Sequence, residues 1–309
     1  MKIIGHKEVI NSFQNALNNN MVSHAHLIIG EDGIGKSLVA KEFAMNILGV
    51  EKDKDYIYII EYRTDKESFG IDYIRKVIEE ANKKPYEFNK KIILIYNGEK
   101  LTVQAQNAFL KTIEEPPKGV FIIITSNSSE SILDTIKSRC QIYKLWPLNK
   151  DEMLEYININ YKGISGEEIN GLLSFSEGVP GRIKKMINDD SFNTIRSIII
   201  DLLKEISTNN SEVVLKYSDI LFKFKGKEEE ILSIFTTFIR DIIIYKEISK
   251  NISILNSDKI KDIEEIANVI SYKKLEKIMR IIDKTRINLN SNVNLWGTFS
   301  TMLISILEE

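Results

Sequence analysis

The chain has 309 residues, of which 43% are hydrophobic and 28% charged, a composition typical of a globular protein with room for two or three domains. Its 42 basic side chains are balanced by 44 acidic ones, so a stand-alone nucleic-acid binder that works by phosphate neutralisation is not expected. A single cysteine, Cys140, excludes an internal disulfide and a cysteine-built zinc site. No apolar run approaches the roughly 20 residues of a membrane helix, and "MKIIGHKEVINSF" lacks a signal-peptide core, so we expect a cytoplasmic protein with no membrane partner.

The first half of the chain alternates short apolar runs with amphipathic stretches. Strands are expected at residues 25–30, 56–62, 91–96, 120–126 and 140–145. Their isoleucine-rich composition, with little polar alternation, is typical of strands buried on both faces of a parallel sheet. Between them, the segments 71–81 and 102–115 space their apolar residues along one helical face. Residues 1–147 are therefore predicted to form an α/β domain with a five-stranded parallel sheet.

The remainder of the chain is predicted to be helical. Residues 148–190 contain short helical patterns joined by turns, which indicates a small helical lid domain. All five prolines lie at or before Pro180, and beyond Gly181 only two glycines interrupt the chain. A stretch so poor in helix breakers, with patterns such as "EEEILSIFTTFIRDIIIYKEI", predicts an all-helical C-terminal domain over residues 191–309. Apolar stripes on more than one side of its long helices favour a role in oligomerisation.

Residues 30–37, "GEDGIGKS", match the phosphate-loop pattern G-x-x-x-x-G-K-[ST] at every required position. A predicted strand precedes them and a predicted helix follows, which is the context in which backbone N–H groups point at phosphates. The glycines would let the backbone approach the ligand, the lysine would reach the terminal phosphates and the serine would bind magnesium. The predicted nucleotide-binding residues are Gly30, Gly33, Gly35, Lys36 and Ser37. The alternative is a glycine-rich strand-to-helix turn that binds nothing.

A phosphate-loop ATPase also needs carboxylates at the end of a neighbouring strand, to hold the metal ion and to polarise the attacking water. The strand expected to provide them, in "KIILIYNGEKL", ends in Tyr96 and Asn97. Neither side chain is anionic at neutral pH, so neither anchors a metal ion well or acts as a strong general base. Glu99 follows too late to replace them unless the turn reverses its direction. The chain is therefore predicted to have no ATPase activity of its own.

Two longer motifs point to a family. "NAFLKTIEEPPKGVFIIITSN" followed by "TIKSRC" resembles the AAA+ clamp-loader subunits of bacterial DNA polymerase III, and the similarity extends over most of residues 5–190. This resemblance implies an AAA+ nucleotide-binding domain, a helical lid and a helical collar. ATP-hydrolysing subunits of the family have Asp-Glu where this sequence has Tyr96 and Asn97, so the resemblance is to the delta-prime class, which does not hydrolyse ATP. The four-cysteine zinc module of many relatives is missing from "GVEKDKDYIYIIEYRTDKES", so no zinc is expected.

The resemblance also assigns roles to two arginines. Arg139, in "KSRC", matches the arginine finger that crosses a subunit interface to the γ-phosphate of the neighbour's ATP. The alternative is an arginine that pairs with a carboxylate of its own subunit. Arg182, in "GVPGR", matches a lid arginine that contacts bound nucleotide, although an exposed lid arginine would fit the same pattern. The local nucleotide site would be weak or vestigial: it would at most hold ATP or ADP with Mg²⁺ loosely, with no cofactor required and no separate metal site.

The implied function is that of a non-hydrolysing subunit that helps the clamp loader place the sliding clamp on DNA. Its expected partners are the gamma/tau ATPase subunits, the delta subunit, the sliding clamp through the complex and DNA through the assembly. Two alternatives stay open. One is an active ATPase subunit of the gamma/tau type, in which Glu99 or another acid completes the site. The other is a stand-alone DNA-binding regulator, which the near-neutral charge disfavours.

Overall fold

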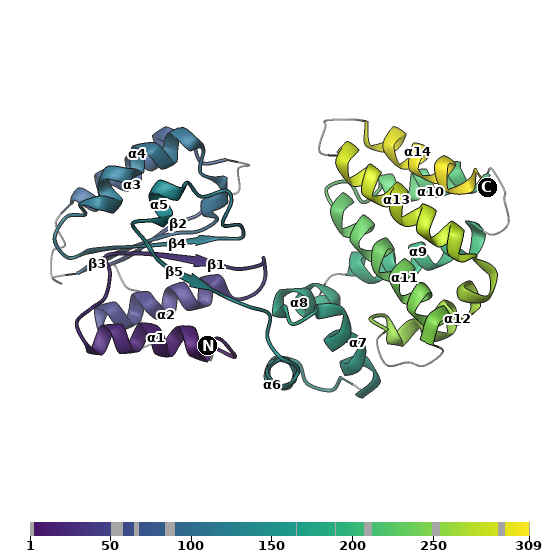
Figure 1. The fold of residues 1–309 in the computed structure, drawn as a ribbon, viewed down its shortest axis with the longest axis horizontal. Helices are drawn as coiled ribbons and strands as arrows, with labels where there is room; N and C mark the ends of the chain where they lie inside the picture. Colours follow the sequence, from purple (N-terminus) through teal and green to yellow (C-terminus); the bar gives the residue numbers. More distant parts are fainter. Residues whose placement is uncertain are drawn as a thin grey trace. The chain divides into compact units, whose positions relative to one another are not determined.

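The computed structural model describes residues 3–50, 58–64, 68–83, 90–164, 166–188, 190–206, 212–248, 254–289 and 294–308. The chain divides into two compact units, which are described separately below (Figure 1). Unit 1 comprises residues 1–160 and 178–181, and unit 2 comprises residues 161–177 and 182–309. No described helix combines the length and the apolar character that crossing a bilayer requires.

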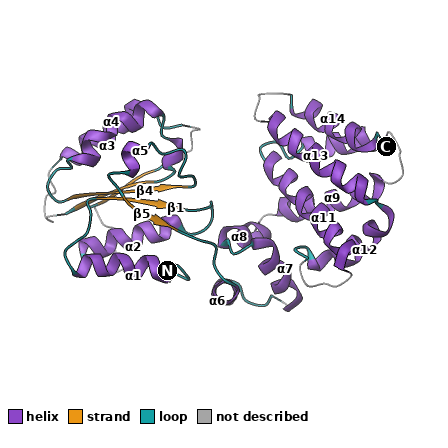
Figure 2. Ribbon diagram, in the orientation of Figure 1, coloured by secondary structure: helices purple, strands orange, loops and turns teal. Residues whose placement is uncertain are grey.

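Unit 1 is built around a five-stranded parallel sheet, which confirms the prediction from the sequence (Figure 2). Its strands are β1 (Ala25–Ile29), β2 (Ile59–Tyr62), β3 (Lys91–Ile95), β4 (Val120–Ser126) and β5 (Gln141–Lys144). They lie in the order β2-β3-β4-β1-β5, and each neighbouring pair is parallel. All residues of β1 and β3 are buried, which explains why their sequences are almost entirely apolar. Residues 56–57 of the segment expected to form β2 lie outside the described residues.

Helices cover both faces of this sheet (Figure 1). The helices of unit 1 are α1 (Lys7–Asn18), α2 (Lys36–Leu48), α3 (Ile71–Asn82), α4 (Val103–Glu114), α5 (Asp134–Lys137) and α6 (Lys150–Asn160), with a 3₁₀ turn η1 (Gly98–Lys100) after β3. α1 and α2 pack on one face, while α3, α4 and α5 pack on the other. Each face has its own apolar core, and on the α1 and α2 side Phe13 and Phe43 stack with ring centroids 3.8 Å apart.

All regular secondary structure in the described residues of unit 2 is helical. Its helices are α7 (Gly166–Ser176), α8 (Pro180–Asn188), α9 (Asp190–Glu205), α10 (Glu212–Phe222), α11 (Glu228–Ile248), α12 (Ile260–Val269), α13 (Tyr272–Leu289) and α14 (Leu295–Leu307), with a 3₁₀ turn η4 (Ser257–Lys259); the first residues of α8 belong to unit 1. This confirms the predicted helical C-terminal part. The boundaries 148–190 and 191–309 stay predictions, since α6 falls in unit 1 and α7 in unit 2.

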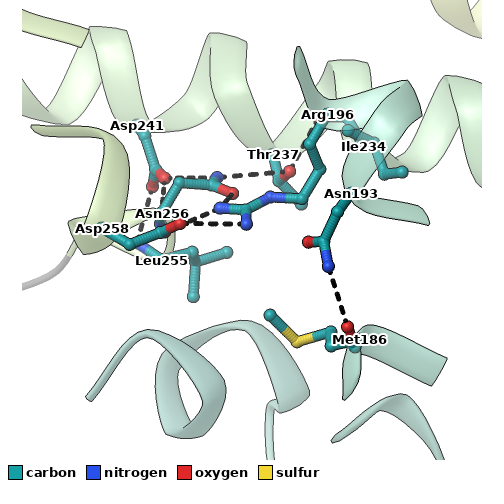
Figure 3. A network of polar contacts seen from close by, with 9 residues as sticks. All are labelled: Met186, Asn193, Arg196, Ile234, Thr237, Asp241, Leu255, Asn256 and Asp258. Atoms are coloured by element: carbon teal, nitrogen blue, oxygen red, sulfur yellow. Dashed lines mark hydrogen bonds and ion pairs between the residues drawn. The ribbon is translucent and has the colours of Figure 1, made fainter. Parts of the chain in front are cut away.

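A buried polar network connects three segments of unit 2 (Figure 3). Arg196 of α9 is 4% exposed, and its guanidinium donates to both carboxylate oxygens of Asp258, at 3.0 and 2.7 Å. It also donates to the side-chain oxygen of Asn256 at 3.0 Å. Asp241 of α11 accepts from the backbone N–H groups of Leu255 and Asn256 at 2.9 and 2.7 Å, although burial raises the pKa of its carboxyl. The network therefore holds the turn before α12 against α9 and α11.

Replacing the arginine tests how strongly this network stabilises the fold. Arg196→Met keeps an unbranched apolar chain but leaves Asp258 and Asn256 without their donor, so we expect the free energy of unfolding to fall by about 2–3 kcal/mol, below the cost for a fully buried pair because Asp258 is one-third exposed. Arg280→Met, which removes an exposed pair with Glu276, should cost under about 0.5 kcal/mol. Urea denaturation followed by circular dichroism measures both. Equal losses would show that the Arg196 network stabilises the fold no more than an exposed ion pair does.

His26 lies on β1, between β4 and β5, and is 1% exposed. Its ring is surrounded by those of Phe13, Phe43 and Tyr143, with centroids 5.5, 6.3 and 5.8 Å away. Because burial removes the water that would solvate an imidazolium, the pKa of His26 is lowered from 6.5 to about 4. His26 is therefore neutral in the folded protein at physiological pH.

This burial predicts a pH dependence of stability. As the pH falls below 6.5 the unfolded chain takes up a proton on His26, whereas the folded chain does not until about pH 4. The free energy of unfolding is thus highest, with respect to His26, well above pH 6.5. It falls as the pH falls, and roughly 3 kcal/mol is lost at pH 4. His26→Phe should flatten this part of the profile in urea unfolding measured across the same pH range. An unchanged difference between the two proteins at every pH would refute the prediction.

Candidate functional site

The phosphate loop begins where β1 ends, in a space with little room for a side chain. The N–H of Gly30 donates to the carbonyl of Ser126 at the end of β4, at 3.1 Å. A Cβ atom at this position would lie 3.0 Å from both the Cβ of Leu145 and the Cγ2 of Ile34. The first glycine of the motif therefore allows the chain to leave the sheet between β4 and β5.

The rest of the loop has the geometry of a phosphate cradle. Gly33 and Gly35 have φ angles of 83° and 110°, in the left-handed region that favours glycine. Lys36 and Ser37 then open α2, whose first-turn N–H groups have no partner within the helix. Within the described residues, no backbone hydrogen bond uses the N–H groups of Gly35, Lys36 or Ser37. These donors at a helix N-terminus fit a nucleoside di- or triphosphate.

Lys36 contacts the loop itself in this structure. Its ammonium donates to the carbonyl oxygens of Gly30 and Glu31 at 2.8 and 2.9 Å, and the residue is 8% exposed. Burial lowers the pKa of Lys36, and the carboxylates of Asp32, Glu99 and Glu31 oppose that shift. These two hydrogen bonds use two of the three N–H groups of the ammonium, so the predicted phosphate contact of Lys36 is compatible with the geometry.

Two contacts to the loop were missed by the sequence interpretation. The Nε2–H of His6, the residue before α1, donates to the carbonyl of Ile34 at 3.0 Å. The N–H of Gly181 donates to the carbonyl of Gly33 at 3.0 Å, and a Cβ on Gly181 would lie 2.5 Å from the Cα of Gly33. The loop is therefore bound on one side by the chain before α1 and on another by the first turn of α8.

Arg182 follows Gly181 directly in the sequence. Its guanidinium pairs with the Glu177 carboxylate of unit 2 at 2.5 Å, and its side chain is one-third exposed. The predicted contact of Arg182 with bound nucleotide stays a prediction.

The two residues that follow β3, Tyr96 and Asn97, are not acids. Tyr96 is 2% exposed and packs in the core on the α2 side of the sheet, with the Arg63 guanidinium 3.9 Å from its ring centroid. Burial raises the pKa of Tyr96 to about 12, so its phenol stays protonated. Asn97 has a φ of 57° and donates its N–H to the hydroxyl of Thr125 at 3.4 Å. Neither residue supplies a negative charge to the loop.

Arg139 lies at the end of the sheet where the strands begin, whereas the phosphate loop lies at the end where they finish. It precedes β5, in which Gln141 pairs with His26 and Lys144 pairs with Ile29. At about 3.3 Å per strand residue, this register places the backbone of Arg139 roughly 15–20 Å from Gly30. The guanidinium donates to the Glu114 carboxylate at 3.2 Å and to the Thr135 carbonyl at 3.0 Å. Arg139 is therefore paired within its own chain and faces away from its own loop.

Comparisons with known proteins agree with this arrangement. The model of a family described as "DNA polymerase III, delta subunit" matches residues 5–149. A second model, "DNA polymerase III, delta subunit, C terminal", matches residues 194–296, so the two together cover most of the chain. The chain belongs to the clamp-loader subunit family of DNA polymerase III.

Individual relatives of this clamp-loader chain support the same assignment. DNA polymerase III subunit delta' of Bacillus subtilis is 23% identical over 97% of this chain and 95% of its own length, which confirms the resemblance to the delta-prime class. DNA polymerase III subunit gamma/tau of Mycoplasma genitalium is 24% identical over 99% of this chain, which spans only 53% of that relative. The crystal structure of a DNA polymerase III gamma subunit-related protein from Thermotoga maritima has the same fold, with a TM-score of 0.53, 17% identity, and coverage of 96% of this chain and 98% of that one.

The contact between two glycines predicts a strong effect of one methyl group. In Gly181→Ala the new Cβ would overlap the backbone of Gly33, which cannot move without displacing the loop, so we expect a loss of about 1–3 kcal/mol and a lower melting temperature. Gly166→Ala is the matched control, since a Cβ there meets no atom within 4 Å and should be neutral or slightly stabilising. Thermal unfolding measures both, and equal melting temperatures for the two variants would rule out a close backbone contact.

Proposed function

We propose that this clamp-loader chain is a non-hydrolysing, delta-prime-like subunit that supplies Arg139 to the ATP of a neighbouring subunit. The observation that supports this best is the pair Tyr96 and Asn97 at the end of β3, a neutral phenol and an amide where an ATPase needs acids. A chain that cannot polarise water can still stabilise a transition state on another molecule. The position of Arg139, at the end of the sheet where the strands begin and away from its own loop, argues against action in cis and supports action in trans.

The contacts of Arg139 are weak enough to be exchanged. The arginine is 36% exposed and the Glu114 carboxylate 54% exposed, so their ion pair contributes only about 0–1 kcal/mol. A guanidinium matches phosphate oxygens in plane and stabilises the charge that grows during phosphoryl transfer, an effect of about 10³–10⁵ in rate where an arginine finger acts. The intrachain pair therefore holds Arg139 at the surface without preventing its transfer to a neighbour's γ-phosphate.

The proposal also assigns partners and cofactors. The chain would assemble with gamma/tau ATPase subunits and the delta subunit, and would act on the sliding clamp and DNA through that complex in the cytoplasm. The helices of residues 191–309 would provide the oligomer contacts. The phosphate loop would bind ATP or ADP without turning it over, so no cofactor is needed for the arginine's role, and zinc has no part in it.

An active gamma/tau-type ATPase is the second candidate. It is favoured by the complete phosphate-loop motif and by the similarity to gamma/tau relatives, which the delta-prime interpretation does not require. It would need a carboxylate at a position other than 96 and 97 to activate water. Sustained ATP turnover by the isolated chain, abolished by Lys36→Ala, would establish this candidate in place of the first.

Two variants in the reconstituted clamp loader distinguish the proposed roles. Lys36→Ala should leave ATP hydrolysis by the complex nearly unchanged, because the loop it disables is not turning over. Arg139→Ala should lower hydrolysis, but only partly, since one copy of this chain supplies one arginine; clamp loading, which needs the sites together, should fall further. Arg139→Lys keeps the charge but loses the planar fork, and should restore little activity.

Steady-state ATPase and clamp-loading assays on purified complexes measure these effects. Size-exclusion chromatography provides the control, because one edge arginine contributes little to a large interface and assembly should persist. Loss of hydrolysis with Lys36→Ala, together with full hydrolysis by Arg139→Ala, would reverse the assignment.

A further inference from the structure

The turn after β3 brings a carboxylate back toward the phosphate loop. Asn97 adopts the left-handed conformation, with φ 57°, and η1 follows at once. Gly98 packs closely against β4: a Cβ on it would lie 2.7 Å from the Cγ2 of Ile124 and 3.2 Å from the carbonyl oxygen of Thr125. A left-handed residue followed by a glycine is what reverses the chain here. Glu99, which the sequence placed too late, is thereby directed to the edge of the sheet where the strands end.

A single peptide group connects Glu99 to the first glycine of the loop. The Glu99 Oε2 accepts from the backbone N–H of Asn127 at 3.1 Å. The carbonyl of the same peptide group, that of Ser126, accepts from the N–H of Gly30 at 3.1 Å. Two hydrogen bonds across one peptide place the carboxylate roughly 8 Å from the Gly30 nitrogen. One Glu99 oxygen is held by this bond, and the other has no described partner among the hydrogen bonds and ion pairs of the described residues.

The charges around the loop favour a divalent cation together with phosphates. Lys36 is the cation of the loop, and the negative charges of Asp32, Glu99 and Glu31 lie near enough to oppose the lowering of its pKa by burial. A cation bound together with the phosphates would offset part of this negative charge. The described residues contain no group of three metal-ligating side chains, so the protein has no preformed cation site there. Magnesium typically binds through one or two carboxylates, several waters and the phosphates of its ligand.

We propose that Glu99 supplies the carboxylate that holds Mg²⁺ on a nucleoside di- or triphosphate in this chain's own phosphate loop, and so makes its nucleotide binding magnesium-dependent. Ser37 and the phosphate oxygens would provide the other ligands. The inference rests on the proposed function only in that the loop does not turn over: Glu99 would hold the metal, and Tyr96 and Asn97 offer no carboxylate to polarise water. Bound nucleotide is then a structural ligand of this subunit.

The test is binding of ADP to the full isolated chain, by calorimetry, with Mg²⁺ present and with Mg²⁺ removed by chelation. For the wild type, removal of Mg²⁺ should weaken ADP binding about tenfold or more. Glu99→Gln should bind ADP as the metal-free wild type does, with or without Mg²⁺, since an amide oxygen still accepts from Asn127 but no longer attracts the cation. The metal-free affinity of this variant reports that its loop is folded.

Asp32→Asn is the matched control, because it removes another negative charge that acts on Lys36 from an exposed position in the loop. It should keep the full magnesium effect. Mn²⁺, which takes similar oxygen ligands, gives a second readout: adding the wild type or Asp32→Asn to Mn²⁺ and ADP should lower the electron paramagnetic resonance signal of Mn²⁺ below that of Mn²⁺ with ADP alone, and adding Glu99→Gln should lower it much less.

Three results would overturn the inference: no ADP binding by the wild type, ADP binding that ignores Mg²⁺, or a magnesium effect that Glu99→Gln retains in full. None of them affects the role of Arg139, which is measured on the hydrolysis of the assembled complex. Failure of the Glu99 inference and failure of the proposed function are therefore separate outcomes.

Discussion

Parallel pairing of β1 with β4 and β5 is the constraint on which every candidate functional group depends. In a parallel sheet the carboxyl ends of all strands lie on one side. Gly30 after β1, Asn97 after β3 and Asn127 after β4 therefore lie close together although they are distant in sequence. The hydrogen bond from Gly30 to Ser126 fixes the loop to that side. The same pairing places Arg139, which precedes β5, at the end where the strands begin. The phosphate loop and this arginine therefore lie at opposite ends of one sheet.

Much of the fold could be predicted from the sequence because its signals are local. The fully buried strands β1 and β3 appear as apolar runs, and α3 and α4 as one-sided helical patterns. The phosphate loop was recognised because its glycine spacing encodes the backbone conformation directly, as the positive φ angles of Gly33 and Gly35 show. What the sequence could not provide is the way the chain divides into compact units, since that depends on contacts summed over distant segments.

The rest of the candidate site depends on contacts that no sequence pattern records. The hydrogen bond from Gly181 to Gly33 and the one from His6 to Ile34 join residues far apart in the chain. The direction of Glu99 depends on one left-handed residue, and asparagine adopts that conformation only in some contexts. In unit 2, the buried pair of Arg196 with Asp258 connects positions whose charged side chains alone would predict an exposed location.

The separation of the loop and the arginine along the same strands gives the domain a polarity. An arginine on one side that serves a nucleotide on the next subunit is a heterologous contact, in which two different patches meet, and repetition of such contacts generates a ring with a direction of rotation. Under the proposed function, this chain gives an arginine at one edge but has no active site to receive one at the other. Such a subunit breaks the rotational equivalence of the ring. Hydrolysis around the ring would then have a fixed first and last position, set by where this chain is inserted.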